Sequence, residues 1–518
     1  MKNSVGRDIP EFLLKDGRGV FDGNARLDGL VYTKPGPTVR ARVKPVEGKI
    51  AGTIRDAITK CAPKDGMTVS FHHHFRDGDY IVNMVMKEIE ALGIKNVTIA
   101  ASSLGTAHDP VAKMIEDGVV TGLQTSGIRG KIGDAVSNGK LKDIAILRSH
   151  GGRVRAIEMG EVHIDIAFIG APTCDEFGNA RGKGGKSDCG VLSYSMADAK
   201  YADYVVVITD TLVPFPNMPP SIEGVDVDYV VLVDEIGNPL KIASQAARMS
   251  DDPRDLMMAE NCSRVMAALP YFKDGFSFQA GAGGPSLAVY RFLEPTMVER
   301  GIRMRWALGG ITAPTVDLLN KGLVDVIADT QDFDIGAVRS VHDNIKHFEI
   351  STSQYANPMN KGAFVNKLDF VILAALEIDT DFNVNVVTGS DGVLRGAPGG
   401  HPDASAGAKC TIIVTPLTRG RIPTVCERVV TVTTPGESVD VLVTDYGIAV
   451  NPARPDISSA LEKAGIPFTA IEALKERAYA MVGAPDDVRF DERVVAVMEA
   501  RDGTILDVVR QVKKYELE

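Results

Sequence analysis

The chain contains 518 residues, 44% of them hydrophobic and 6% aromatic, and carries a formal net charge of −11 at pH 7. This length and apolar content exclude a disordered chain and allow several domains, since one domain averages roughly 100–150 residues. The negative charge disfavours binding along the phosphate backbone of nucleic acid. No segment approaches the roughly 18 continuous apolar residues of a membrane-spanning helix, and residues 1–10 lack a signal-peptide core. We expect a cytoplasmic protein that binds neither membranes nor nucleic acid.

The cysteines and histidines give little reason to expect a metal. The 6 cysteines are far apart in the chain, which fits neither a disulfide framework nor a zinc site. His72, His73 and His74 are consecutive, but no second cluster of ligand-type residues has a recognisable spacing. We therefore expect no bound metal, and we expect these three histidines, with Arg76, to line a cleft instead.

Residues 1–45 are predicted to form an extended N-terminal arm, because they contain glycine, proline and scattered charges with little periodicity. Residues 29–46 include basic residues and no acidic one. Two interpretations are open for this segment. It can be a strip that docks an acidic partner, or a solvated arm, which short charged runs usually are.

After the arm, strands and helices alternate. Residues 67–71 form a β-type run, and Asp79 can cap a helix whose apolar positions recur at helical spacing until Gly93. Further along, residues 165–170 and 204–209 are almost continuously apolar. Such runs are typical of parallel strands that are covered on both faces.

The order of these elements recurs after about 204 residues, a period far longer than the roughly 20–50 residues of solenoid repeats. We therefore predict an α/β fold of two similar tandem domains with mostly parallel sheets, at residues 46–269 and 270–518. The cleft where two such domains meet is the expected place for a small ligand. The clearest matches between the halves are polar positions with identical spacing: Asp165, Asp175 and Asn179, and then Asp369, Asp379 and Asn383.

Three glycine-rich loops are candidates for binding. Residues 279–285 lie between a predicted strand and a helix, where backbone N–H groups can bind an anion or an oxyanion, although the glycines do not match a dinucleotide-binding motif. Residues 389–403 are predicted to be a long mobile loop, which inside a domain is usually functional or disordered. Residues 178–188 place basic side chains beside flexible backbone, as a clamp for a polycarboxylate or as a basic surface turn.

Residues 164–179 and the loops at 279–285 and 390–403 resemble the CoA-transferase superfamily and, within it, the citrate lyase alpha-subunit family, over essentially the whole chain. The resemblance implies two CoA-transferase-like domains that move the thioester from acetyl-carrier protein to citrate, giving citryl-carrier protein and acetate. It implies a beta subunit that cleaves the citryl thioester, and a gamma subunit, the acyl carrier, whose prosthetic group derives from dephospho-CoA. The chain itself would bind no cofactor and would form a homo-oligomer within the complex.

One departure from the superfamily affects the expected mechanism. Many members use a glutamate nucleophile at a position where this chain has Gln331, and an amide cannot attack a thioester as a carboxylate can. We therefore expect the citrate carboxylate to attack the acetyl thioester directly, which gives a mixed anhydride and a thiolate. The thiolate then attacks the citryl carbonyl and expels acetate, with no acylated protein. Asp332 is the alternative nucleophile.

The resemblance and the loop positions also assign roles to residues. Backbone amides near Gly281 and Gly283 are expected to bind the tetrahedral oxyanion, with Gln331 and Asp332 in the catalytic region. Polar and basic side chains are expected to bind citrate: His72, His74, Arg76, Arg129, Asn179, Lys183 and Lys186. Loop residues of the second half are expected to bind the carrier arm: Gln279, Gly284, Ser390, Asp391, Gly392, Gly399, Gly400 and His401.

Two alternatives stay open from the sequence. The cleft can serve another acid, such as malonate or citramalate, because substrate choice depends on a few contacts. The same fold also hosts non-catalytic scaffold or sensor subunits, although glycine loops in both halves argue against that role.

Overall fold

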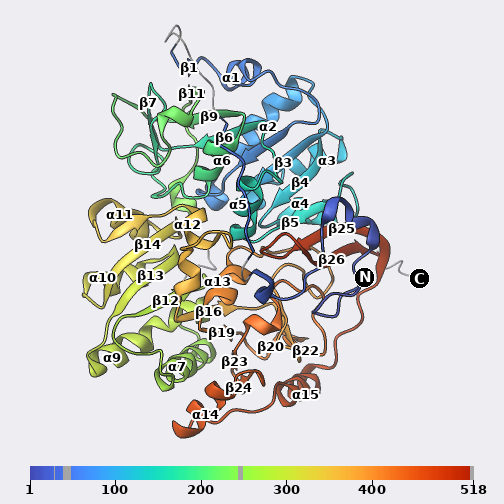
Figure 1. The fold of residues 1–518 in the computed structure, drawn as a ribbon, viewed down its shortest axis with the longest axis vertical. Helices are drawn as coiled ribbons and strands as arrows, with labels where there is room; N and C mark the ends of the chain where they lie inside the picture. Colours follow the sequence, from blue (N-terminus) through green and yellow to red (C-terminus); the bar gives the residue numbers. More distant parts are fainter. Residues whose placement is uncertain (28–29, 39–47, 243–248, 514–518) are drawn as a thin grey trace.

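The computed structural model describes residues 1–27, 30–38, 48–242 and 249–513, and contains two large sheets that lie one above the other in Figure 1. The first sheet has 10 strands, in the order β1 (Ile50–Ala51), β11 (Tyr229–Leu232), β9 (Tyr204–Thr209), β6 (Ile166–Gly170), β2 (Thr68–Phe71), β3 (Val97–Ala101), β4 (Val120–Thr125), β5 (Ala145–Leu147), β25 (Phe490–Glu499) and β26 (Ile505–Val512). The second has 8 strands, in the order β15 (His347–Glu349), β14 (Val324–Asp332), β13 (Met304–Ile311), β12 (Phe276–Ala280), β16 (Phe370–Ala374), β19 (Cys410–Val414), β23 (Val441–Thr444) and β24 (Gly447–Val450).

The strand order confirms the predicted repeat. The run β11-β9-β6-β2-β3-β4-β5 in the first sheet corresponds, strand by strand, to β23-β19-β16-β12-β13-β14-β15 in the second. Every neighbouring pair within both runs is parallel. The continuously apolar runs predicted at 165–170 and 204–209 overlap β6 and β9, which are buried on both faces as parallel strands require.

Helices cover both sheets. The first half contains α1 (Ile54–Lys60), α2 (Ile81–Ala91), α3 (Val111–Glu116), α4 (Gly130–Ser137), α5 (His150–Glu158) and α6 (Ser195–Tyr201). The second contains α7 (Pro253–Ala268), α8 (Gly284–Ala288), α9 (Tyr290–Arg300), α10 (Ala313–Asn320), α11 (Ile335–Asp343), α12 (Thr352–Ala356), α13 (His401–Gly407), α14 (Pro455–Lys463) and α15 (Ile471–Val482). Among the described helices, none has the length and apolar character needed to cross a bilayer.

Alternating residues of β16 divide the second core into two layers. Phe370 and Ile372 pack in the layer that contains residues of α7 and α9, whereas Val371 and Leu373 pack in the layer that contains residues of α12, α13 and α15. Successive side chains of a strand point to opposite faces, so the sheet is enclosed on both sides. Helix α12 also lies against α5 of the first half, which brings the two halves together at this point.

The C-terminal hairpin crosses from the second half into the first. Strand β25 pairs in parallel with β5, so residues 490–512 complete the first sheet. The prediction placed the hairpin in the second domain, 270–518, but its strands belong to the first sheet. The edge of β5 is satisfied by backbone from residues 490–499.

The N-terminal arm packs on the same hairpin. Val20 bridges to Ile505, and Ile9 shares a small core with Val494, Val497 and Ile505. Of the predicted basic strip, residues 29 and 39–46 lie outside the described residues, whereas Lys34 forms an ion pair with Glu158 of α5. Figure 1 shows the N-terminus on this edge of the molecule, beside the hairpin.

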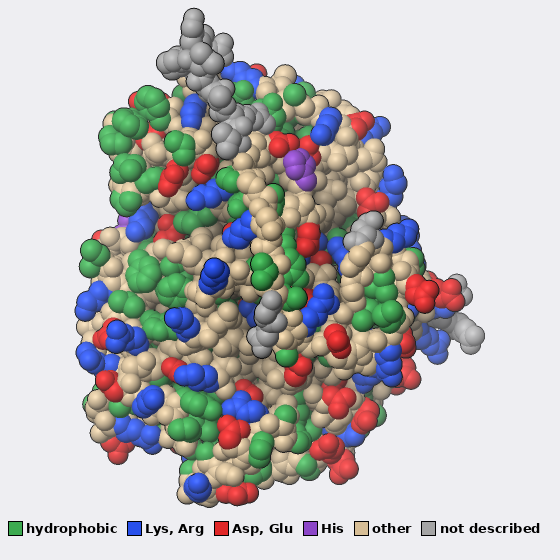
Figure 2. All heavy atoms as spheres, viewed as in Figure 1, with side chains coloured by type: hydrophobic (Ala, Val, Ile, Leu, Met, Phe, Trp, Pro, Cys, Tyr) green, Lys and Arg blue, Asp and Glu red, His purple; other side chains and the backbone are tan. Residues whose placement is uncertain are grey.

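Each half also carries a small three-stranded sheet. These are β10 (Leu212–Val213), β7 (Thr173–Asp175) and β8 (Ala180–Arg181) in the first half, and β18 (Val384–Asn385), β17 (Glu377–Asp379) and β22 (Val425–Cys426) in the second; a two-stranded sheet pairs β20 (Thr418–Arg419) with β21 (Ile422–Pro423). Helix α15 packs on β22, whereas Phe177 and Phe215 beside β7 are each about half exposed. Figure 2 shows hydrophobic side chains gathered over the β7 region.

Candidate active site

A cavity of about 930 Å³ lies between the two halves, at the carboxyl ends of their parallel strands. From the first half it is lined by residues that follow β2, β3 and β4, and from the second by residues in or after β12, β14 and β16. This is the edge of parallel sheets where small ligands usually bind. The cavity brings together several of the predicted residues: Arg76, Arg129, Gln279, Gly281, Gly283, Gln331, Gly399, Gly400 and His401.

Two arginines of the first half contribute positive charge to the cavity. Arg76 follows β2 with a φ of 51°, which is uncommon for a residue with a side chain, and its guanidinium lies 4.5 Å from the ring centroid of Phe333 in the second half. Burial and then the nearby Arg129 lower the pKa of Arg76 to about 10. Two guanidinium groups this close repel each other, so an anion between them stabilises both.

Beside the arginines lies a cluster of three rings from the first half. The ring centroid of Tyr194 is 4.9 Å from that of His73 and 4.6 Å from that of His150, and the two imidazoles are 5.8 Å apart. Burial lowers the pKa of His73 well below its usual range, and burial with Arg153 lowers the pKa of His150 to about 3. Both imidazoles are therefore neutral at physiological pH.

Gln331 reaches this cluster from the second half. Its side-chain Nε2 donates to the carbonyl of His73 at 3.1 Å, and its Oε1 accepts from the hydroxyl of Tyr194 at 3.4 Å. The side chain is buried and lines the cavity, in the region where the superfamily comparison led us to expect a nucleophile. An amide fixed by two hydrogen bonds offers no carboxylate to a thioester.

The glycine loop after β12 forms the opposing wall, but its amides are not equivalent. The N–H of Gly281 donates to the carbonyl of Ile372 at 2.7 Å, so this amide is not available to an oxyanion, which corrects the role expected for it. The N–H groups of Ala282 and Gly283 donate to no backbone carbonyl among the described residues. Backbone amides that line a cavity without an internal acceptor are suited to a developing oxyanion.

The loop at 395–400 is held against the first half, which corrects the expectation of a mobile loop. Gly396 accepts from the N–H of Ile128 at 3.1 Å, and Gly399 donates to Ser126 at 3.3 Å and accepts from His150 at 2.8 Å. A side chain at Gly127 would collide with Ala397. Because these bonds connect residues far apart in the chain, glycine content alone did not indicate them.

Other residues predicted to bind the carrier arm either lie outside the cavity or have partners within the protein. Ser390, Asp391, Gly392 and Gly284 lie outside the residues that line the cavity. Asp391 instead forms an ion pair with Arg395 at 2.6 Å. His401 lines the cavity, but its Nδ1 bonds to Thr434 at 2.7 Å and its Nε2 to the carbonyl of Ala374 at 3.1 Å. Both ring nitrogens of His401 are therefore engaged in hydrogen bonds within the second half.

Several residues predicted to bind citrate lie elsewhere. Nε2 of the buried His72 lies 3.0 Å from a carboxylate oxygen of Asp198, and His74 is buried beside the ring of Tyr194. Lys183 donates to the carbonyl of Val341 at 2.7 Å, and the exposed Lys186 is not among the cavity-lining residues.

Asn179 holds a turn beside the small sheet of the first half. Its side-chain Nδ2 donates to the carboxylate of Asp175 at 2.9 Å, and its side-chain Oδ1 accepts from the backbone N–H of Gly224 at 2.9 Å. The corresponding Asn383 bonds to Asp379 and Gly436 in the same way. The identical spacing found in the sequence therefore reflects the repeated fold.

Asp332 lies behind Gln331, outside the cavity-lining residues. A side chain at Gly190 would overlap its carboxylate, which is buried beside Asp329. Burial and the Asp329 carboxylate raise the pKa of Asp332 well above its usual range, so that Asp332 is protonated and a poor nucleophile.

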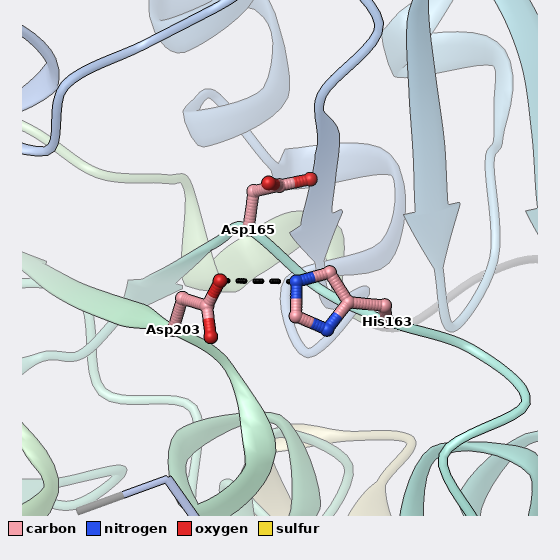
Figure 3. Close-up of side chains that lie close together, drawn as sticks. All are labelled: His163, Asp165 and Asp203. Atoms are coloured by element: carbon pink, nitrogen blue, oxygen red, sulfur yellow. Dashed lines mark hydrogen bonds and ion pairs between the residues drawn. The ribbon is translucent and has the colours of Figure 1, made fainter.

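Two groups of possible metal ligands occur among the described residues, and both have protein partners. Asp329 and Asp332 of β14 lie together with His347 of β15, and His347 bonds to Asp329 at 3.0 Å and to Ser340 at 2.9 Å. The other group consists of His163, Asp165 and Asp203. Figure 3 shows the bond between His163 and Asp203, while Asp165 pairs with Lys64 at 2.8 Å.

Several cavity-lining residues were not predicted from the sequence: His150, Tyr194, Phe333, Tyr355, Arg395 and Arg419. One signal was available for His150. It follows β5 and begins α5, directly after the N-cap Ser149, so it lies at the carboxyl edge of the sheet like the other site residues. The others depend on contacts between distant segments.

The comparisons with known proteins agree over the whole chain. The model of the family "Citrate lyase, alpha subunit (CitF)" matches residues 47–512. The citrate lyase alpha chain of Klebsiella pneumoniae is 49% identical over 516 residues, which is 100% of both chains, and that of Escherichia coli K12 is 52% identical over 90% of this chain and 91% of its own.

Solved structures give the same result. The alpha subunit of citrate lyase from Streptococcus mutans, solved in complex with citrate, is 50% identical and superposes with a TM-score of 0.96 over 99% of this chain and 100% of its own. The 4-hydroxybutyrate CoA-transferase of Porphyromonas gingivalis, 18% identical, shares the fold with a TM-score of 0.51 over 83% of this chain and 97% of its own. By sequence and by structure, this chain belongs to the citrate lyase alpha-subunit family.

Proposed function

We propose that this protein transfers the thioester of an acetyl-acyl-carrier protein to citrate, giving citryl-carrier protein and acetate. The observation that carries the proposal is the composition of the inter-half cavity. Arg76 and Arg129 of the first half face the same cavity as the glycine loop at 281–283 of the second half. The neutral amide of Gln331 lines this cavity as well. Membership of the citrate lyase alpha-subunit family supports this assignment.

Arg76 and Arg129 are the groups that bind citrate carboxylates in this proposal. Their mutual repulsion is relieved when a carboxylate lies between them, and guanidinium groups bind carboxylates through paired hydrogen bonds. The Streptococcus mutans relative was solved with citrate, which supports a citrate site in the family.

The reaction proceeds in two steps without an acylated protein. A carboxylate oxygen of citrate bonds to the acetyl carbonyl carbon, and the carbon–sulfur bond breaks with its electron pair leaving on sulfur. The thiolate then bonds to the citryl carbonyl carbon of the mixed anhydride, and the anhydride bond breaks with acetate as the leaving group. The amides of Ala282 and Gly283 bind an oxyanion in this scheme, and no proton is transferred overall.

The carrier arm, a prosthetic group derived from dephospho-CoA, enters as a substrate on the gamma subunit and passes the loop at 395–400. A beta subunit then cleaves the citryl thioester. In this proposal the chain works in the cytoplasm as a homo-oligomer within a citrate lyase complex, and it binds no cofactor or metal of its own.

The test is to incubate the purified chain with acetyl-carrier protein, or acetyl-CoA, and citrate, and to measure acetate release and citryl thioester by mass spectrometry. The proposal expects both products and no protein adduct after trapping with hydroxylamine or borohydride. A stoichiometric adduct on Asp329 or Asp332 would reject the direct route. Malonate and citramalate are run in parallel, and faster acetate release with either acid would change the substrate.

A further inference from the structure

The two-step transfer requires negative charge to develop on two different carbonyl oxygens in succession. The first belongs to the acetyl thioester and the second to the citryl group of the mixed anhydride. These two carbonyls flank one bridging oxygen, so their oxygens occupy different positions in the cavity. Hydrogen-bond donors fixed in the glycine loop of the second half cannot reach both carbonyl oxygens without moving. The other oxygen therefore needs a hydrogen-bond donor from the first half.

His73 lies at the right place in the first half. It follows β2, lines the cavity, and its ring stacks on Tyr194 with centroids 4.9 Å apart. The backbone carbonyl of the same residue accepts from the Gln331 side chain at 3.1 Å. The ring of His73 is therefore held by the first half and its backbone by the second half.

Ser102 determines which ring nitrogen of His73 carries the proton. Its Oγ accepts a hydrogen bond from the backbone N–H of His73 at 3.0 Å and lies 2.5 Å from Nδ1 of the same residue. We assign the hydroxyl proton of Ser102 to this contact, which makes Nδ1 the acceptor and leaves the proton on Nε2. His73 lines the cavity, whereas both ring nitrogens of the neighbouring His74 are buried without a hydrogen-bond partner among the described residues.

The surroundings of His73 also keep the imidazole neutral. Burial lowers the pKa of His73, and His150, His74, Arg76 and Arg129 lower it further because each disfavours a second positive charge. A neutral imidazole can polarise a carbonyl by donating a hydrogen bond, without giving up its proton.

We propose that His73 is a further catalytic residue, whose Nε2–H donates a hydrogen bond to the carbonyl oxygen that becomes negative on the first-half side of the cavity. When an oxygen or sulfur nucleophile bonds to the carbonyl carbon, the carbonyl electron pair moves onto this oxygen and the hydrogen bond strengthens. The proton stays on His73, and the pair returns to reform the carbonyl when the leaving group departs. Ser102 is the positioning residue that fixes the tautomer. This inference rests on the proposed acyl transfer.

The test compares His73→Ala and His73→Gln with wild type in steady-state transfer from acetyl-carrier protein to citrate. Loss of one such donor is expected to lower kcat by roughly 10²–10³-fold, with the KM for citrate changed by less than about threefold. The glutamine variant keeps an N–H donor and is expected to recover part of kcat. Ser102→Ala is expected to lower kcat by about tenfold, because the proton is then shared between the two nitrogens.

The matched control is His163→Ala, because His163 is an exposed histidine outside the cavity, and this variant is expected to keep wild-type kinetics. Citrate binding by calorimetry confirms that each variant is folded. We expect the kcat of the wild type not to change with pH between 5.5 and 8, since His73 stays neutral in this range. A raised KM with unchanged kcat, or a bell-shaped profile that disappears in His73→Gln, would overturn the inference. Absence of any transfer by the wild type would instead reject the proposed function.

Discussion

The two halves of the molecule share one order of strands but furnish the cavity by different means. The first half contributes side chains, namely Arg76, Arg129 and the rings of His73, His150 and Tyr194. The second contributes the backbone of the loops at 281–283 and 395–400, together with side chains such as Gln331, Phe333 and Tyr355. A repeated fold can therefore divide the binding of anions and the polarisation of carbonyls between its copies. The predictions below test this division, beginning with the largest expected effect.

Arg76→Gln should be the most damaging of the single changes on the first-half wall. Removing a partly buried cation from a bound carboxylate typically costs about 2–5 kcal/mol, so kcat/KM for citrate is expected to fall by about 10²–10³-fold. Lys186→Gln is the matched control, because Lys186 lies outside the cavity. Initial rates over a range of citrate concentrations give both values. Equal losses in the two variants would show that overall charge, and not the cavity, binds citrate.

On the second-half wall, the expected effect belongs to a backbone group. Gly283 has a φ of −79°, which proline can adopt, so Gly283→Pro removes the amide N–H with little change of conformation. We expect kcat to fall by roughly 10²-fold. Gly283→Ala keeps the N–H and places its Cβ 3.3 Å from Ala374, a tight but adjustable contact. Similar kcat values for the two variants would remove this amide from the mechanism.

Gln331→Glu sharpens the role of the residue between the two walls. A carboxylate cannot donate to the carbonyl of His73, as the amide does at 3.1 Å, so we expect kcat to fall about tenfold from a loss near 1.4 kcal/mol. The new carboxylate should also form an acyl adduct, detected by mass spectrometry after borohydride treatment. An adduct on the wild-type chain would contradict the direct route.

The neutral state of His150 predicts a pH dependence of stability. Its pKa is about 3 in the folded protein and about 6.5 in an unfolded chain, so the unfolded state alone binds a proton between these values. Stability is therefore fully present above pH 6.5 and falls as the pH drops, by up to about 1.4 kcal/mol per pH unit. Urea unfolding of wild type and His150→Gln at pH 7 and pH 5.5 measures this, and identical pH slopes would show that His150 does not contribute.

Asp332→Asn should have the smallest effect. Because burial and Asp329 keep Asp332 protonated, an amide of the same shape replaces it with little change, and kcat should stay within about threefold of wild type. The same assay measures this variant. A loss of 10²-fold or more in a variant that unfolds at the wild-type urea concentration would restore Asp332 as the nucleophile.

The general architecture could be predicted from the sequence because it depends on local patterns. The strand at 204–209 and the helix that follows Asp79 are indicated by the pattern of neighbouring residues. The same order of patterns occurs again in the second half, which strengthens the prediction. Positions just after strands, such as Arg76 and Gln331, were accessible for the same reason.

The remaining features depend on contacts between distant residues. The bond from Gly281 to Ile372 removes one amide from the site, and the bonds of Gly399 fix a loop that its glycines suggested to be mobile. The spacing of Asn179 and Asn383 was a true repeat signal, yet it marked a structural turn rather than a ligand. No pattern within one segment distinguishes these cases.

The C-terminal hairpin has a consequence for how substrates enter. Since β25 is hydrogen-bonded to β5 and the N-terminal arm packs on the hairpin, the chain returns to the first half after completing the second. The hairpin thus adds a second connection between the halves, which limits how far they can separate. We therefore expect a carrier-bound thioester to pass side chains and short loops at the rim of the cavity.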